Sequence, residues 1–302
     1  VRRTIKHYNL DVIIGVACVA LWLVFTPDLA QLFHSQDLLP FLLFAPIWTL
    51  AFAAAVDRGF LTANLRFIVL AVVILGEALT KFGLAVLFVH TGYPQWVYAA
   101  IPLSMVLPLG IGWWVSRRTT SPVDLDPGHV AYFPGRYFAT SVLVGLSTLG
   151  FLSLDVILAK RFLDPVSAGN YALLSLVGKM IYFFGKLVSQ FTTPLVSRAE
   201  GAGHNSQKVF MPIFALSTLA TLVVFVALGP FGRLTVPILL GSKANPILPY
   251  LTLYSLALAL YTLATIVIDY HQARRHYLFP VTGFFLAILQ VVALSLFHDH
   301  LS

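Results

Sequence analysis

Long apolar stretches, broken at short intervals by polar turns, are the dominant feature of this chain. A helix that crosses hydrocarbon about 30 Å thick needs roughly 20 apolar residues. Nine stretches approach this length, at residues 12–33, 38–56, 67–89, 95–115, 137–159, 168–194, 209–229, 247–268 and 277–297. The sequence therefore predicts an all-α, multi-pass membrane protein with about nine transmembrane helices.

The composition agrees with this class, since 59% of the 302 residues are hydrophobic and 10% are charged. Soluble domains carry about 25% charged residues. The single cysteine, Cys18, excludes an intramolecular disulfide and a Cys-based metal site. Because most loops are too short to form a soluble domain, we expect the function to be carried out within or across the membrane.

The formal net charge of +7 is distributed unevenly between alternate loops. One set of loops holds Arg2, Arg3, Lys6, Arg58, Arg66, Arg117, Arg118, Arg136, Arg198, Lys208, Arg274 and Arg275, and the other holds Lys160, Arg161, Arg233 and Lys243. Basic residues concentrate in cytoplasmic loops. This bias predicts a cytoplasmic N-terminus and a C-terminus on the far side, and it explains the basic excess without nucleic acid as a partner.

A polar segment rich in proline and glycine separates four spans from five. We expect residues 1–116 to form part of an N-terminal lobe with four transmembrane helices. Residues 117–136 are predicted to be a cytoplasmic linker. The remaining residues, 137–302, are predicted to form a C-terminal lobe with five transmembrane helices.

A faint internal repeat crosses this linker. Residues 38–67 and 247–276 align without a gap at an offset of 209, which pairs Arg66 with Arg275. Both copies run from outside to inside, so they predict two parallel, pseudo-symmetric lobes; chance similarity between leucine-rich helices is the alternative.

Only the second copy is preceded by two extra spans, and the chain begins with valine. We therefore expect about two N-terminal helices, and one or more C-terminal ones, to be missing from this sequence.

Polar side chains recur on one face of the stretch at 168–194. That face comprises Ser175, Lys179, Tyr182, Lys186, Ser189 and Thr193, with Gln190 beside it. Residues three or four apart lie on the same side of a helix. Because a charge at the bilayer centre costs about 2.5 to 3.5 kcal/mol on insertion scales, this polar stripe should face protein or water rather than lipid.

The two lysines of the stripe are candidate ligands for an anionic group. Lysine can bind phosphate as a point charge, and Lys179 and Lys186 lie about 10 Å apart along a helix axis. Alternatively, each lysine pairs with a carboxylate and stabilises the bundle. Mid-membrane carboxylates are few in the sequence, which favours a substrate-binding cavity lined by both lysines, Tyr182, Ser175 and Gln190.

Three further ionisable residues lie within spans. Glu77 and Lys81 have the i,i+4 spacing of an intrahelical ion pair, and they could serve either structure or ion coupling. Asp155 lies near the outer end of its span, where Lys160 or Arg161 could pair with it. A structural role is favoured for Asp155.

Signals for soluble-type catalysis are weak. Asp124 and Asp126, with His129 nearby, could mimic the metal–nucleotide motif of a membrane glycosyltransferase, but an isolated Asp-x-Asp between prolines is more often a turn. His298 and His300 lack further ligands in the sequence around them, and the sequence has no glycine-rich phosphate loop. We therefore expect no cofactor, no metal site and no enzymatic activity.

Two stretches resemble polysaccharide-exporting flippases, from the superfamily that also includes lipid II flippases and multidrug and toxin extrusion antiporters. In residues 153–198 the matching elements are Asp155 before ILAKRFL, AGNY at 168–171, Gly178-Lys179 and Pro194. The segment DRGFLTANLRF, at 57–67, resembles a cytoplasmic turn of the same family. The resemblance implies two six-helix lobes around a central cavity, of which the present spans would be helices three to eleven.

The resemblance also implies a function: moving undecaprenyl-diphosphate-linked oligosaccharide from the inner to the outer leaflet by alternating access. Cationic cavity residues that meet the diphosphate recur in the family, and Lys179 and Lys186 match them by position, whereas Glu77 and Lys81 match no family motif. The implied location is the inner (plasma) membrane.

Several partners are expected on the same basis: the lipid-linked oligosaccharide, membrane lipids, a polysaccharide polymerase and glycosyltransferases, with no nucleic acid. The alternatives are a cation-coupled multidrug antiporter of the same superfamily and, less favoured, a membrane glycosyltransferase.

Overall fold

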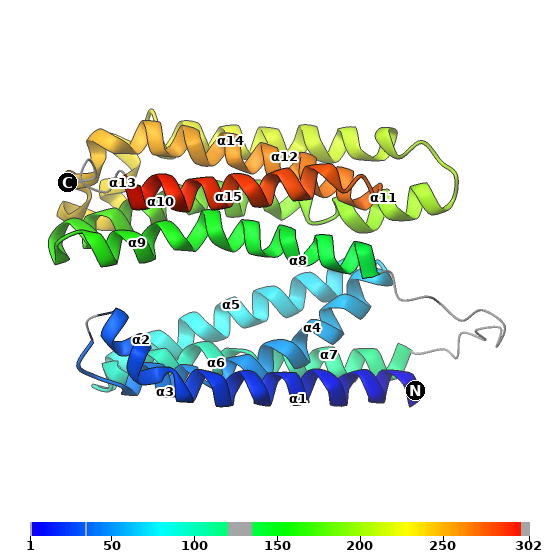
Figure 1. Cartoon of the computed structure of the whole chain (residues 1–302), viewed down its shortest axis with the longest axis horizontal. Coiled ribbons are helices and arrows are strands. Elements are labelled where there is room, and N and C mark those ends of the chain that lie inside the picture. Colours follow the sequence, from blue (N-terminus) through cyan, green and yellow to red (C-terminus); the bar gives the residue numbers. More distant parts are fainter. Residues whose placement is uncertain (1, 34, 120–134, 297–302) are drawn as a thin grey trace. The chain divides into compact units, whose positions relative to one another are not determined.

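The computed structural model describes residues 2–33, 35–119 and 135–296, and helices are the regular elements that these residues form. The first part contains α1 (Arg2–Val24), α2 (Thr26–Leu32), α3 (Leu39–Phe44), α4 (Ile47–Ala63), α5 (Phe67–His90), α6 (Ala100–Ser104) and α7 (Val106–Thr119). The second contains α8 (Gly135–Leu149), α9 (Asp155–Phe162), α10 (Pro165–Ser189), α11 (Thr192–Gly201), α12 (Ser206–Leu228), α13 (Gly232–Leu240), α14 (Leu248–Ala273) and α15 (Leu278–Leu296). Figure 1 shows these elements along the chain.

Eight helical segments within the described residues are long and apolar enough to cross a membrane. The number rises to nine if the bent pair Val12–Val24 and Thr26–Leu32 is one span. This confirms the prediction of an all-α, multi-pass membrane protein with about nine transmembrane helices.

The chain divides into two units, residues 1–130 and 131–302. Each unit has its own internal packing and is considered separately. Most of the predicted linker, 117–136, lies outside the described residues, so its role stays a prediction.

In unit 1, α1 packs along α4, and α4 packs against α7. The first pair approaches closely at Gly15, where a Cβ would lie 2.7 Å from the Cα of Thr49. Leu61, Leu70 and Val73 form a small buried cluster on α4 and α5. The unit is thus held by apolar contacts between neighbouring helices.

In unit 2, α10 packs against both α12 and α14, and α8 packs against α15. Close approach depends on two glycines of α10: a Cβ at Gly178 would collide with the ring of Tyr254, and one at Gly185 with Thr221 and Thr262. A π-helical turn, Gly150–Leu154, joins α8 to α9 and ends directly before Asp155. Such single π turns within α-helices often occur at functional positions.

The turns after α4 and α14 share an uncommon backbone feature. Leu65 and Arg275 both have positive φ, at 54° and 63°, which non-glycine residues seldom adopt. In each turn the next N–H bonds to the carbonyl five residues earlier: Arg66 to Leu61 at 2.9 Å and His276 to His271 at 2.8 Å. These turns correspond at an offset of 210, one more than the sequence alignment, and this ending is common at helix C-termini, so the two-lobe repeat stays a prediction.

We predict that Gly185→Ala destabilises the protein by about 1–3 kcal/mol, because the added methyl group overpacks the contact with Thr221 and Thr262. Gly169→Ala, on the same helix with open space around it, is the control and should be neutral or slightly stabilising. Unfolding of purified protein in detergent measures the difference. Equal stability of the two variants would contradict the packing assigned to Gly185.

Candidate functional site

The Asp155 carboxylate is at the centre of a buried polar cluster in unit 2. Its side chain is 3% exposed. Oδ2 accepts hydrogen bonds from the hydroxyl groups of Tyr254 at 3.0 Å, Ser175 at 3.2 Å and Tyr171 at 3.3 Å. Two of these donors come from α10 and one from α14, so the carboxylate connects three helices.

Lys179, one turn beyond Ser175, forms the ion pair with Asp155. Its Nζ lies 3.7 Å from Oδ1, an oxygen that accepts no hydrogen bond from the described residues. The expected pairing of Asp155 with Lys160 or Arg161 is therefore wrong. Those residues lie five and six positions further along the helix, and side chains on one helix meet at separations of three and four.

The second lysine, Lys186, forms an ion pair and hydrogen bond with Asp269 of α14. The expectation that these lysines lack carboxylate partners is therefore wrong. Asp269 was missed because the predicted span ended at residue 268, which assigned the carboxylate to a turn. In the structure α14 continues to Ala273 and keeps Asp269 on the helix.

An aromatic layer lies between the two ion pairs. Tyr182 of α10 stacks on Tyr261 of α14 with ring centroids 5.8 Å apart, and Phe151 lies 4.5 Å from Tyr261. The Nζ atom of Lys186 is 5.9 Å from the centroid of the Tyr182 ring. The aromatic layer therefore separates the ion pairs and contributes a weak cation–π contact to one of them.

Most of the predicted polar stripe packs inside unit 2. Ser175, Tyr182 and Ser189 are buried, so the stripe faces protein rather than lipid, as its polarity required. Gln190 is an exception: it is exposed at the end of α10, where its side-chain amide donates to the carbonyl of Leu187 at 2.8 Å. Gln190 therefore lies apart from both ion pairs.

Unit 1 contains a separate charged group around Glu77. This carboxylate of α5 forms an ion pair with Arg58 of α4, and Lys81 Nζ lies 4.0 Å away from it. The sequence predicted the contact with Lys81 but placed Arg58 in a loop. Arg58 instead lies within α4, and its pairing with Glu77 links two helices.

A cavity of about 620 Å³ lies beside the Asp155 cluster within unit 2. Tyr171 and Tyr254, which donate to Asp155, also line this cavity, together with Tyr250, Asn170 and Ser167. The Asp155 cluster is thus in contact with a space bordered by aromatic rings, hydroxyl groups and an amide.

The predicted metal-like motifs cannot be placed. Asp124, Asp126, His129, His298 and His300 lie outside the described residues. Within residues 2–33, 35–119 and 135–296, no three His, Cys, Asp or Glu side chains are grouped as metal ligands would be.

A family model described as "polysaccharide biosynthesis protein" matches residues 3–249. No curated protein and no solved structure matches the chain. The match covers well over half of the sequence and includes Asp155 and the whole of α10, but it ends before Tyr254 of α14. The chain, a multi-pass membrane protein, belongs to the polysaccharide biosynthesis protein family.

Proposed function

We propose that this protein is a transporter, not an enzyme, that flips undecaprenyl-diphosphate-linked oligosaccharide from the inner to the outer leaflet by alternating access. It acts in the cell's inner membrane with its N-terminus in the cytoplasm. Family membership supports a role in polysaccharide biosynthesis. The observation that carries the finer proposal is the loose contact between Lys179 and Asp155, beside a cavity bordered by tyrosine rings and an amide.

Lys179 is suited to exchange its partner. Its Nζ is 3.7 Å from Asp155, which is long for a charge-assisted hydrogen bond. If Lys179 turns toward a phosphate group, Asp155 still accepts hydrogen bonds from Tyr171, Ser175 and Tyr254. The carboxylate then remains solvated by protein, so releasing the lysine carries a reduced penalty.

Lys186 is placed differently. Among the described residues, Lys186 is the one side chain that donates a hydrogen bond to Asp269. Withdrawing Lys186 would leave a carboxylate without compensation inside the unit, which is strongly unfavourable. We assign substrate contact to Lys179 and a structural role to Lys186, in place of the equal roles that their shared stripe predicts.

The cavity beside Asp155 provides groups that suit the oligosaccharide. Tyr250 and Tyr254 offer ring faces and hydroxyl groups, and Asn170 offers an amide that can donate and accept. A sugar likewise has apolar ring faces and polar hydroxyl edges. Tyr182, Ser175 and Gln190 are also proposed to contact the substrate, although Gln190, at the exposed end of α10, would do so away from this cavity. The polymerase and glycosyltransferases of the same process are the proposed partners.

The alternative, a cation-coupled multidrug antiporter, would use carboxylates to attract cationic substrates. In unit 2 the two span carboxylates already face lysines, which compete with such substrates. Glu77, Lys81 and Asp155 remain candidates for ion coupling in either transporter. Efflux of a cationic dye driven by Na⁺ or H⁺ would favour the antiporter over the flippase.

We predict that Lys179→Gln lowers flipping of a lipid-linked oligosaccharide in proteoliposomes at least tenfold, because the diphosphate loses its cation. Lys243→Gln, an exposed lysine in a connection between helices, is the control and should flip at the original rate. The unfolding temperature of both variants should stay within a few degrees of the original. Normal flipping by Lys179→Gln would disprove the assignment.

We predict a different outcome for Lys186→Gln, which leaves Asp269 unpaired. Stability should fall by up to about 3 kcal/mol, the lower end of the range for broken buried pairs, because both side chains keep some exposure. The double variant Lys186→Gln/Asp269→Asn removes both charges and should recover most of the loss. Unfolding in detergent measures both, and no recovery in the double variant would argue against the ion pair as the cause.

A further inference from the structure

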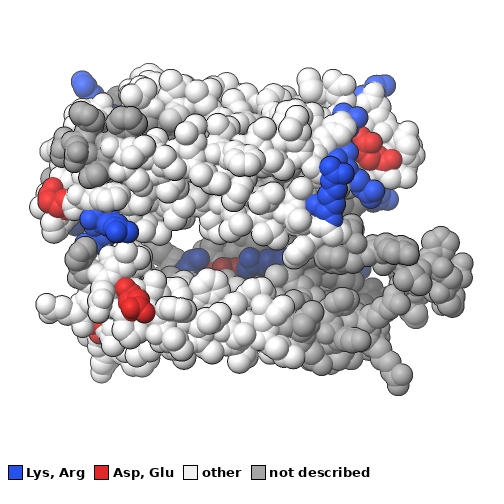
Figure 2. Space-filling model, in the orientation of Figure 1, with Lys and Arg blue, Asp and Glu red and all other residues white. Residues whose placement is uncertain are grey.

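A second cavity, of about 830 Å³, lies at the end of unit 2 where α8 begins and α11 and α14 end. Its polar lining includes Arg136, Tyr137, Glu200, Arg274, Arg275 and Tyr277, and we call it the basic pocket. In Figure 2, Lys and Arg gather at the right-hand end of this unit, with acidic residues beside them. Three guanidinium groups and one carboxylate line the pocket, so its charge is clearly positive.

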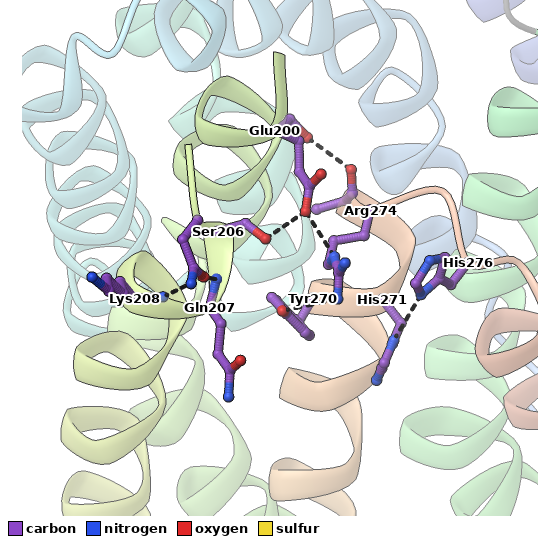
Figure 3. A network of polar contacts seen from close by, with 11 residues as sticks. Glu200, Ser206, Gln207, Lys208, Tyr270, His271, Arg274 and His276 are labelled. Atoms are coloured by element: carbon purple, nitrogen blue, oxygen red, sulfur yellow. Dashed lines mark hydrogen bonds and ion pairs between the residues drawn. The ribbon is translucent and has the colours of Figure 1, made fainter. Parts of the chain in front are cut away.

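Arg274 is held in place by neighbours on two helices. Its Nε donates to Glu200 at 2.7 Å and its Nη1 donates to the hydroxyl group of Tyr270 at 3.2 Å. Ser206 also donates to Glu200, so the carboxylate itself is oriented (Figure 3). The remaining nitrogen of Arg274, Nη2, donates to none of the described residues. Its N–H groups can therefore donate to a ligand.

The other two arginines have no carboxylate partner in the described part of the chain. The guanidinium of Arg136 lies over the ring of Tyr277, 4.9 Å from its centroid. Arg275 is exposed and follows directly after Arg274. It is the residue of this turn that has a positive φ. Two cations thus line one cavity without a carboxylate partner among the residues of unit 2 that the structure describes.

Membrane topology and helix dipoles explain only part of this arrangement. Basic residues favour cytoplasmic turns and the C-terminal ends of helices, which accounts for Arg274 and Arg275 after α14. The same topological bias covers Arg136, but the helix dipole does not, because Arg136 lies in the first turn of α8, the positive end of the dipole, where a cation is unfavourable. An anion at this position would be attracted both by Arg136 and by the helix end.

We propose that the basic pocket binds a phosphate group at the membrane surface. Arginine binds phosphate through two parallel N–H donors, and basic pockets between transmembrane helices bind phosphorylated lipid headgroups. The volume of the cavity is within the range of small-molecule sites. The phosphate is supplied by an anionic lipid headgroup or by soluble phosphate, and the proposal does not depend on flipping activity or on Lys179.

The test compares lipid retention by two double variants of the purified protein. Arg136→Gln/Arg275→Gln removes both unpaired cations and spares the contact between Arg274 and Glu200. Arg233→Gln/Lys243→Gln is the matched control, because it removes two exposed charges from the opposite end of unit 2. Native mass spectrometry after exchange into mixed micelles of phosphatidylglycerol and phosphatidylcholine reports how many molecules of each lipid stay bound.

We expect the original protein and the control to retain phosphatidylglycerol over phosphatidylcholine, and Arg136→Gln/Arg275→Gln to lose at least fivefold of that preference. Loss of preference to the same extent in both double variants, or in neither, would exclude a lipid headgroup as the ligand of the basic pocket. Arg136→Lys/Arg275→Lys keeps the charge without the fork and should retain an intermediate preference. The unfolding temperature of Arg136→Gln/Arg275→Gln in detergent should stay within a few degrees of the original, which shows that this variant is folded.

A second arm distinguishes the two sources of phosphate. Inorganic phosphate and pyrophosphate are added at millimolar concentration to protein in neutral detergent, and their binding is measured by calorimetry. If phosphate or pyrophosphate gives binding heat that disappears in Arg136→Gln/Arg275→Gln, the ligand of the basic pocket is soluble phosphate. If the arginines determine lipid preference but no such heat is seen, the ligand is a lipid headgroup. Absence of both arginine-dependent signals contradicts the proposal.

Discussion

Charged groups within a hydrocarbon layer need partners, and this requirement determines how α10 is placed in unit 2. Lys179 pairs with Asp155 at the start of α9, and Lys186 pairs with Asp269 on α14. Each lysine is directly preceded by a glycine, and these glycines, Gly178 and Gly185, are where neighbouring side chains of α12 and α14 lie against the helix. The sequence Gly-Lys therefore occurs twice, two turns apart, and each copy combines a close helix contact with an ion pair. The rotation of α10 follows from satisfying both copies together.

The helices of this protein were predictable from the length of its apolar stretches, because a bilayer demands about 20 such residues for each crossing. The polar face of α10 was predictable from residue spacing. Partners from other helices were not: Asp269 fell one residue beyond a predicted span, and Arg58 was assigned to a loop. Apolar length identifies the middle of a span but not the last turns of its helix. Those turns are where both of these charged residues lie.

The two ion pairs of α10 differ in what surrounds the carboxylate. Asp155 accepts three hydroxyl donors in addition to its contact with Lys179. Asp269 accepts its hydrogen bond from Lys186. Since the cost of losing a cation depends on the donors that remain, the first pair can open at lower cost than the second. Spacing on one helix face treats the lysines as equivalent, and only the contacts from α9 and α14 distinguish them.

Between the basic pocket and Lys179, positive charge occurs at three levels of unit 2, and the degree of neutralisation differs between them. The guanidinium groups of Arg136 and Arg275 at the basic pocket have no carboxylate partner within the described part of the unit. Lys186 comes next along α10 and is held by Asp269, and Lys179 follows about 10 Å further along the axis with a looser partner. A phosphate group would therefore be attracted most at the basic pocket and next at Lys179. The level between them stabilises the fold, so a ligand at either end need not disturb the contact between α10 and α14.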